Sequence, residues 1–266
     1  MIVDGRTIAR EILEETKERA LRLPKPPSFL AVAVAPLPAT ESYLKMKREQ
    51  AASVGIEMNV RIYESSTTEE LVKMLAEVTE DAVIVQLPMP DAIDLHTVLD
   101  AIPPEKDADV LARYTREKQM LMHPVAAAVR EILTRNAVDP NGKCVTVVGK
   151  GWLVGAPAAA WLRSVGAQVT VVTRDEGNLK DALREADIVV TGAGAAGLIG
   201  KDDVKQGVVI IDIGTSELGG SLTGDVHPEV AEAASLFTPV PGGVGPVTVA
   251  FLLSNVVTLA ERSVRA

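Results

Sequence analysis

One run of residues decides the fold class of this chain: Val145-Thr146-Val147-Val148-Gly149-Lys150-Gly151-Trp152-Leu153-Val154-Gly155-Ala156-Pro157. Its β-branched start predicts a buried strand, its glycines a tight turn, and its small residues after Val154 the start of a helix. A strand, a glycine-rich turn and a helix N-terminus together let the backbone approach a dinucleotide pyrophosphate. The spacing G-x-G-x-x-x-G is one residue longer than the common fingerprint, so a tight turn that binds nothing is the alternative.

Strand patterns alternate with helical patterns on both sides of this run, which is typical of an α/β protein with mainly parallel sheets. In the first half we expect helices at 8–21, 41–54 and 68–78 and strands at 29–35, 57–63 and 82–87. In the second half we expect helices at 125–135, 155–165 and 247–257 and strands at 144–148, 168–173, 188–191 and 208–213. The prolines at 103–104 and 124 mark a domain crossing. We therefore predict two domains, an N-terminal α/β catalytic domain of residues 1–118 plus 246–266 and a Rossmann-like domain of residues 119–245.

Composition and charge exclude several classes of protein. The 266 residues are 47% hydrophobic and 24% charged, which excludes a wholly disordered chain. The net charge of -9 argues against a nucleic-acid or anionic-membrane binder. A single cysteine, Cys144, forms no internal disulfide, residues 1–5 lack a signal-peptide pattern, and the apolar stretch 247–260 is too short for a bilayer. We expect a cytoplasmic protein with no membrane, nucleic-acid or metal partner.

The residues that follow the strand at 168–173 bear on cofactor choice. They are Arg174, Asp175 and Glu176. An acidic residue at this place pairs with a ribose hydroxyl and favours NAD, whereas a basic residue pairs with a 2′-phosphate and favours NADP. Lys150 and Arg174 can together neutralise a phosphate, so we predict NADP, with NAD as a possible substitute. A solvated loop is the remaining interpretation.

Candidate chemistry in the first half begins with Tyr43 and Lys47. They are four residues apart on a predicted helix and therefore share one face, where an aromatic ring and an amine can hold a ring system beside a proton-transfer group. An exposed pair of side chains is the alternative. Gln86 ends a buried strand, at the carboxyl edge where ligands bind in open parallel sheets, although it can also be a strand-end cap.

A loop rich in proline and glycine, residues 238–248, precedes the last predicted helix. It reads Thr238-Pro239-Val240-Pro241-Gly242-Gly243-Val244-Gly245-Pro246-Val247-Thr248. Glycines let a backbone approach a flat ligand without a Cβ, and prolines reduce the entropy of holding that approach. We interpret it as a ligand-contacting loop, with a sharp turn between strand and helix as the alternative.

These motifs, in this order, resemble those of the methylenetetrahydrofolate dehydrogenase/cyclohydrolase family. Residues 241–248 resemble PGGVGPMT, with Val247 at the methionine, and the glycine turn resembles GRSxxVGxP. Tyr43 and Lys47 match a Tyr-x-x-x-Lys segment, residues 85–90 resemble VQLPLP, and residues 104–110 resemble PxKDVDG. Residues 210–215 and 224–226 resemble DVGxN and GDV. The matches extend over nearly the whole chain.

The resemblance implies oxidation of 5,10-methylenetetrahydrofolate to the 5,10-methenyl form with NADP, followed by hydrolysis to 10-formyltetrahydrofolate. It assigns folate stacking to Tyr43 and the cyclohydrolase step to Lys47, whose pKa must then be lowered by burial or a neighbouring cation. The implied catalytic residues are Lys47, Gln86, Tyr43 and Asp109, and the implied substrate-binding residues are Tyr43, Gln86, Leu87, Pro88, Asp109, Pro241, Gly242 and Gly243. The implied cofactor-binding residues are Gly149, Lys150, Gly151, Leu153, Val154, Arg174, Gly192, Ile213, Gly214 and Thr215. The expected partners are tetrahydrofolate derivatives, and the expected assembly is a homodimer.

Some positions depart from the family pattern. Lys150 and Gly151 replace an arginine and a serine that commonly contact the 2′-phosphate, and residues 121–126 keep only Pro124 of PCTPxG. Val110 replaces a glycine, and because a β-branched residue does not readily adopt positive φ, we expect a different local backbone. These departures leave two alternatives open. One is a folate-binding cyclohydrolase with a weakened dehydrogenase, and the other is a two-domain oxidoreductase of the shikimate-dehydrogenase type.

Two further residues carry expectations. His123 is interpreted as a structural or solvent-facing histidine rather than a general base, because no partner is evident from the sequence. Asp225 is expected to fix the loop before the Pro-Gly segment or to cap a turn.

Overall fold

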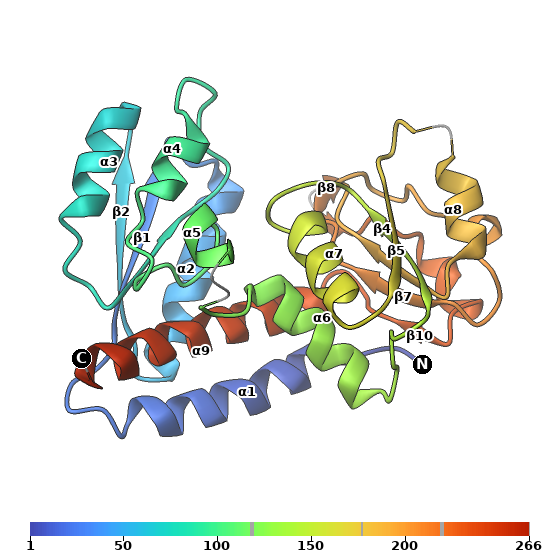
Figure 1. Ribbon diagram of the computed structural model, residues 1–266, viewed down its shortest axis with the longest axis horizontal. Helices are drawn as coiled ribbons and strands as arrows, with labels where there is room; N and C mark the ends of the chain where they lie inside the picture. The colour runs from blue at the N-terminus through green and yellow to red at the C-terminus, as the bar shows by residue number, and fades with distance from the viewer. Residues whose placement is uncertain (118–119, 177, 219–220, 266) are drawn as a thin grey trace. The chain divides into compact units, whose positions relative to one another are not determined.

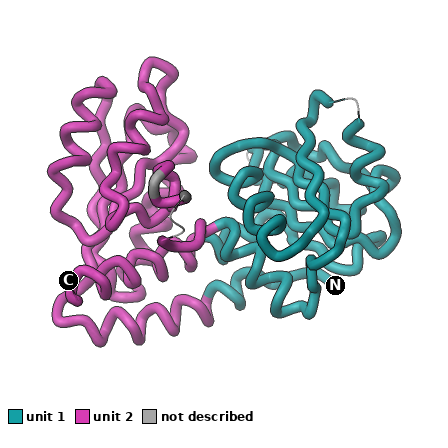
Figure 2. Tube along the Cα trace, in the orientation of Figure 1, with its two compact units in different colours: residues 1–9, 125–248 teal, residues 10–124, 249–266 magenta. Residues whose placement is uncertain are grey.

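The structure is a computed structural model that describes residues 1–117, 120–176, 178–218 and 221–265. It divides into two compact units, residues 1–9 with 125–248 and residues 10–124 with 249–266 (Figure 2). The chain changes unit within two helices, α1 (Gly5–Ala20) and α9 (Val244–Arg265), and after Pro124. Unlike the predicted boundaries, residues 1–9 group with the Rossmann-like unit, because the Val3 N–H donates to the Phe237 carbonyl and the Gly5 N–H to that of Gly242.

The unit of residues 10–124 and 249–266 is built on a three-stranded parallel sheet in the order β2-β1-β3. These strands are β1 (Ser28–Val34), β2 (Glu57–Tyr63) and β3 (Ala82–Val85), and β1 and β3 are buried almost throughout. Parallel strands buried on both faces read as continuous apolar runs, as both of these do. The connecting helices are α2 (Pro38–Ser53), α3 (Thr68–Ala76), α4 (Leu95–Asp100) and α5 (Arg113–Glu117) (Figure 1).

The C-terminal helix α9 completes the core of this unit. Its residues Val249, Leu253 and Val257 are buried in one cluster with Phe29 and Ala31 of β1. It runs beside α1, where Arg19 pairs with Glu261 at 2.9 Å and donates to side chains of α9 (Figure 1). At 22 residues α9 extends beyond the apolar stretch 247–260 at both ends, and by length and composition alone it could cross a membrane. In this fold it is a core helix, with 56% of its most apolar window buried.

The unit of residues 1–9 and 125–248 holds a five-stranded parallel sheet in the order β10-β7-β6-β4-β5. The strands are β4 (Cys144–Val148), β5 (Gln168–Val172), β6 (Ile188–Thr191), β7 (Val209–Asp212) and β10 (Leu236–Phe237). The helices are α6 (Pro124–Arg135), α7 (Gly155–Ser164), α8 (Leu179–Glu185) and the short 3₁₀ turns η1 (Lys201–Asp203) and η2 (Pro228–Glu232); β8 (Ser216–Leu218) and β9 (Ser221–Thr223) form a hairpin.

The strand order of this sheet places a ligand crevice. After β4 the chain forms β5 on one side and then crosses to form β6 on the other side of β4. In an open α/β sheet, such a switch in direction creates a crevice at the carboxyl ends of the two strands. Here Gly149 follows β4 and Gly192 follows β6. The N–H of Gly192 donates to the Val148 carbonyl at 3.0 Å. The predicted fold class, α/β with a Rossmann-like domain, is confirmed.

Candidate active site

Lys47 and Tyr43 share one face of α2, as their spacing predicts. The Lys47 ammonium nitrogen lies 4.6 Å from the centre of the Tyr43 ring. Only 5% of Lys47 is exposed, whereas Tyr43 keeps 37% of its surface exposed. An amine at this distance over an aromatic face makes a cation–π contact when it is charged. The ring is thus held next to the amine while part of it stays accessible to a ligand.

Gln86 follows β3 and reaches back to Lys47. Lys47 Nζ donates to Gln86 Oε1 at 3.0 Å, and Gln86 Nε2 donates to the Leu87 carbonyl at 2.8 Å. The second bond fixes which end of the amide faces the lysine, because the Nε2 end is occupied by a carbonyl. The backbone of Gln86 is held in turn, since its N–H donates to the Val32 carbonyl at 2.7 Å. Leu87 and Pro88 are joined by a cis peptide bond just beyond.

Burial and Asp109 act on Lys47 in opposite directions. Desolvation lowers the pKa of Lys47, because a buried ammonium loses its hydration, and the negative charge of Asp109 raises it. Conversely, burial raises the pKa of Asp109 and the Lys47 charge lowers it. A lysine with a lowered pKa has more neutral amine near neutral pH, which is the form that accepts a proton.

A tight loop at 107–112 presents Asp109. The carboxylate of Asp107, fully buried, accepts hydrogen bonds from the N–H groups of Leu111 at 3.3 Å and Ala112 at 2.9 Å. Burial raises the pKa of Asp107 to about 6, against the hydrogen bonds that it accepts. No role was predicted for Asp107 from the sequence, because the sequence does not indicate which backbone N–H groups the side chain of an aspartate in a turn accepts.

Val110 lies in the same loop with φ at 59°. The left-handed conformation is present despite the β-branched side chain, so the premise that a valine avoids positive φ does not hold at this position. That side chain is 3% exposed, and Asp107 holds the N–H groups of the two residues that follow. Packing and hydrogen bonds therefore impose a conformation that costs a valine about 1–2 kcal/mol relative to its ordinary backbone.

The Pro-Gly loop packs against the start of the chain. Gly242 has φ at 104°, and a Cβ on it would lie 3.7 Å from the Arg6 guanidinium. A Cβ on Gly243 would lie 2.6 Å from the Pro239 carbonyl oxygen, and one on Gly5 would overlap the Gly243 carbonyl. Close backbone packing therefore requires a glycine at Gly243, and the contact of this loop with a ligand stays a prediction. Pro241 follows a cis peptide bond.

The glycine turn after β4 has the close packing that a dinucleotide-binding turn requires. Gly149 has φ at 109°, and a Cβ on Gly155 would overlap the Gly149 carbonyl. A Cβ on Gly192 would overlap the side chain of Val154, so these residues lie together at the carboxyl ends of β4 and β6. The predicted Gly151 and Leu153 are exposed, and nothing lies within 4 Å of a Cβ placed on Gly151. α7 begins at Gly155 directly behind the turn.

The two basic residues predicted to read a phosphate each have an acidic neighbour. Lys150 Nζ lies 2.6 Å from Glu176 Oε1, and Arg174 Nε lies 3.8 Å from Asp175 Oδ2. The hydrogen bond from Lys150 lowers the pKa of Glu176. Lys150 belongs to the glycine turn, and its contact with Glu176 brings the segment after β5 to that turn. The Lys150 ammonium group is therefore already paired with the Glu176 carboxylate.

A buried pair of aspartates supports the neighbouring loops. Asp225 accepts hydrogen bonds at 2.7 Å from the Thr191 hydroxyl and from the N–H groups of Ala193 and Ala195. It therefore fixes the loop after β6, which includes Gly192, and not the loop before the Pro-Gly segment as expected. Asp212 accepts from the N–H groups of Gly214 and Val226, both at 2.9 Å. Burial and the neighbouring Asp225 raise the pKa of Asp212 to about 7.

Gly214 lies against this pair, Ile213 and Thr215 are its neighbours in sequence, and His123 belongs to the other unit. A Cβ on Gly214 would overlap the Asp225 carboxylate, so only glycine fits there. Ile213 donates its N–H to the Thr191 carbonyl at 2.8 Å, and Thr215 lies between β7 and β8. His123 is buried, and burial beside Arg116 lowers its pKa to about 3. His123 is therefore neutral near pH 7. Of the two expected interpretations, a structural or a solvent-facing histidine, its burial agrees with the structural one.

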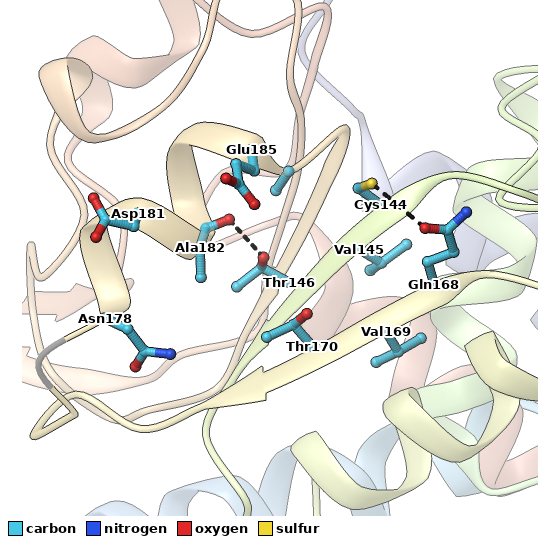
Figure 3. Close-up of a pocket in the computed structure, with 11 residues that line it drawn as sticks. Cys144, Val145, Thr146, Gln168, Val169, Thr170, Asn178, Asp181, Ala182 and Glu185 are labelled. Atoms are coloured by element: carbon cyan, nitrogen blue, oxygen red, sulfur yellow. Dashed lines mark hydrogen bonds between the residues drawn. The ribbon is translucent and has the colours of Figure 1, made fainter.

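One hollow in the Rossmann-like unit lies away from all of these residues (Figure 3). It is formed by the first residues of β4 and β5 and by α8, and the Thr146 hydroxyl donates across it to the Ala182 carbonyl at 2.8 Å. The polar side chains that line it include Gln168, Asn178 and Asp181. None of the predicted site residues contributes to it, because those residues follow the opposite, carboxyl ends of the strands.

Comparison with known proteins identifies the family. Residues 3–109 match the profile described as Tetrahydrofolate dehydrogenase/cyclohydrolase, catalytic domain, and residues 124–264 match that of its NAD(P)-binding domain. A relative from Methanospirillum hungatei, named Bifunctional protein FolD, is 36% identical over 98% of both chains.

Solved structures agree. The Trypanosoma brucei N5,N10-methylenetetrahydrofolate dehydrogenase-cyclohydrolase, solved with NADP cofactor and an inhibitor, aligns with a TM-score of 0.93 at 35% identity over 100% of this chain and 99% of that one. Shikimate dehydrogenase from Aquifex aeolicus shares only the fold, at 14% identity and a TM-score of 0.56 over 91% of this chain and 98% of that one. The chain belongs to the tetrahydrofolate dehydrogenase/cyclohydrolase family.

Proposed function

We propose that this protein oxidises 5,10-methylenetetrahydrofolate to 5,10-methenyltetrahydrofolate with NADP and hydrolyses the product to 10-formyltetrahydrofolate. The observation that carries the proposal is the Lys47 amine, buried, bonded to Gln86 and placed over the Tyr43 ring. Family membership supports it over the full chain.

The glycine turn after β4 fits a dinucleotide. Gly149 has a positive φ, a Cβ on Gly155 would overlap the Gly149 carbonyl, and α7 directs its N-terminus at the turn. NADP supplies the acceptor for the hydride that leaves the methylene carbon. The chain's own contribution to this half-reaction is orientation: Asp225 fixes the loop that contains Gly192, and Asp212 fixes Gly214.

The second half-reaction adds water to the methenyl carbon and opens the ring. As the water oxygen bonds to that carbon, the neutral Lys47 amine accepts a proton from the water. The C–N5 bond then breaks as N5 receives a proton and the new hydroxyl gives one up to become the formyl carbonyl on N10, so that of the two water protons one ends on N5 and one is released. Gln86 Oε1 orients the amine through the 3.0 Å bond, and burial lowers the pKa of Lys47, which increases the fraction of neutral amine. We assign Tyr43 to stacking on the folate and Asp109 to contact with the pterin.

An absorbance assay tests both halves separately. Purified protein is mixed with methylenetetrahydrofolate and NADP or NAD to follow reduction of the cofactor, and with methenyltetrahydrofolate alone to follow loss of the methenyl chromophore. We expect both reactions, with NADP preferred. Methenyl hydrolysis without hydride transfer would overturn the dehydrogenase half, and hydride transfer without hydrolysis would overturn the assignment of Lys47.

We also propose that the protein works as a homodimer in the cytoplasm. The acidic composition and the single cysteine support the location. Light scattering on the purified protein tests the assembly, and a monomer at micromolar concentration would contradict it.

A further inference from the structure

Asn255 is a polar residue on the apolar face of α9. Its neighbours on that helix, Leu252, Leu253 and Val256, are buried in the core of the unit. Asparagine is a weaker helix former than leucine, because its amide competes for backbone hydrogen bonds. A polar side chain among buried apolar ones therefore calls for a specific partner.

The partners of Asn255 are two backbone carbonyls. Its Nδ2 donates to the Ala108 carbonyl at 2.9 Å and to the Met122 carbonyl at 3.0 Å. Because both partners are acceptors, the nitrogen and not the oxygen of the amide must face them. One side chain thus ties α9 to the loop at 107–112 and to the segment before Pro124.

Ala108 directly precedes Asp109 and is completely buried. The loop beyond it contains Val110 at positive φ, a backbone that a valine does not hold without external support. Asp107 supports the loop from its far side, through Leu111 and Ala112. Asn255 holds the loop at the residue before Asp109, through its hydrogen bond to the Ala108 carbonyl.

We propose that Asn255 is a positioning residue for the cyclohydrolase step, because its amide holds the Ala108 carbonyl and so fixes Asp109 relative to Lys47. This inference rests on the proposed function. The titratable groups around Lys47 are Tyr43 on α2 and Asp109, with Asp107 next along the loop. Since Asp109 raises the pKa of Lys47, a displaced Asp109 lets that pKa fall.

Asn255→Leu, which keeps the size of the side chain and removes its amide, tests the proposal. We expect the KM for methenyltetrahydrofolate to rise on the order of threefold to tenfold, as for the loss of one hydrogen bond. We also expect the acid limb of the kcat–pH profile to move to lower pH, since Lys47 then loses its proton at lower pH. Asp109→Asn removes the charge altogether and should move the limb further in the same direction.

Thr258→Val is the matched control. It lies on the same helix and loses a hydrogen bond of 2.7 Å from Arg19 and one of 2.9 Å to the Ser254 carbonyl, whereas Asn255 bonds to the loop at 107–112. We expect it to lower Tm while leaving both KM and the acid limb unchanged. If Asn255→Leu does not fold, Asn255→Ser, whose shorter side chain does not reach both carbonyls, should give the same shifts to a smaller extent.

The outcomes separate the inference from the function on which it depends. A folded Asn255 variant with unchanged KM and an unchanged acid limb would overturn the positioning role. A wild-type protein that does not hydrolyse methenyltetrahydrofolate would instead overturn the proposed function. A fall in Tm with the kinetic constants of the wild type would show that Asn255 is only structural.

Discussion

Lys47 and Gln86 are joined by a 3.0 Å hydrogen bond although 39 residues separate them, one on a helix and the other just beyond a strand. The bond fixes an amine in a place from which water is largely excluded. Because Gln86 Nε2 is held by the Leu87 carbonyl, the glutamine cannot turn away without losing a second bond. The position of Lys47 is therefore fixed by Gln86, whose own amide is fixed by the Leu87 carbonyl.

Removal of the amine should eliminate methenyl hydrolysis. We expect Lys47→Met to lower kcat for this step by about 10²–10⁴-fold, the usual effect of losing a general acid–base group, while folate binding persists on the unbranched stem. Lys45→Met, an exposed lysine of the same helix, is the control and should be unaffected. Normal hydrolysis by the Lys47 variant would remove this lysine from the mechanism.

A carboxylate in place of Gln86 should shift the pH dependence of hydrolysis upward. Gln86→Glu puts a negative charge where an amide oxygen now lies 3.0 Å from Lys47 Nζ. An adjacent opposite charge favours the protonated amine and raises its pKa, so the acid limb of kcat moves to higher pH. The profile of this variant is compared with that of Gln86→Leu, which adds no charge. A Glu variant whose limb moved to lower pH would contradict the geometry.

Cofactor preference should respond to Glu176 as well as to the basic residues. Glu176→Gln releases Lys150 from its carboxylate partner and should raise affinity for NADP relative to NAD. Replacing both Lys150 and Arg174 by alanine should do the reverse, at about 1.5–3 kcal/mol for each charge-assisted hydrogen bond to the phosphate that is removed. Binding of the two dinucleotides is measured by titration calorimetry. Equal changes for NADP and NAD would show that none of the three residues reads the phosphate.

At Val110, substitution by glycine should leave a more stable protein than substitution by alanine, the reverse of the usual order of stability. At an ordinary helical position, glycine is less stable than alanine by about 1 kcal/mol. At φ of 59° the order should invert, so Val110→Gly unfolds at a higher denaturant concentration than Val110→Ala, although it removes one more carbon. Both should be less stable than the wild type, whose buried isopropyl group they lose. An alanine variant that is the more stable of the two would show that the loop relaxes.

Asp212 should make stability fall as pH rises. Its folded pKa of about 7 lies above its ordinary value of 3.8, so the folded protein binds more protons than the unfolded chain between these two values. Stability therefore declines through this window, and Asp212→Asn, which has no charge to lose, should not show the decline. The free energy of unfolding is measured at several pH values from 4 to 7 for both proteins, about the range of the shift. Parallel curves would contradict burial of the charge.

The sequence predicts the parts of the site that depend on local periodicity. Tyr43 and Lys47 share a face because a helix repeats every 3.6 residues, and Gln86 ends a strand because the apolar run stops there. Their meeting depends on how α2 packs on the sheet, which no local pattern gives. Asn255 was missed because a polar residue in an apolar helix looks like an interruption until its carbonyl partners are known. The packing of Gly243 on the Pro239 carbonyl was also not predicted, since a glycine that packs on backbone and one that contacts a ligand look identical in sequence.

The place of α9 in the core bears on how this chain folds as it is synthesised. Val249, Leu253 and Val257 fill a cluster with β1, which emerges from the ribosome more than two hundred residues earlier. Until the final helix is made, the sheet of that unit has an uncovered apolar face. Nascent chains halted before residue 249 should therefore bind chaperones and be cleaved by protease within residues 28–85, whereas full-length chains should resist. Burial of β1, the first strand to be synthesised, is thus complete only after α9, the last helix, has been made.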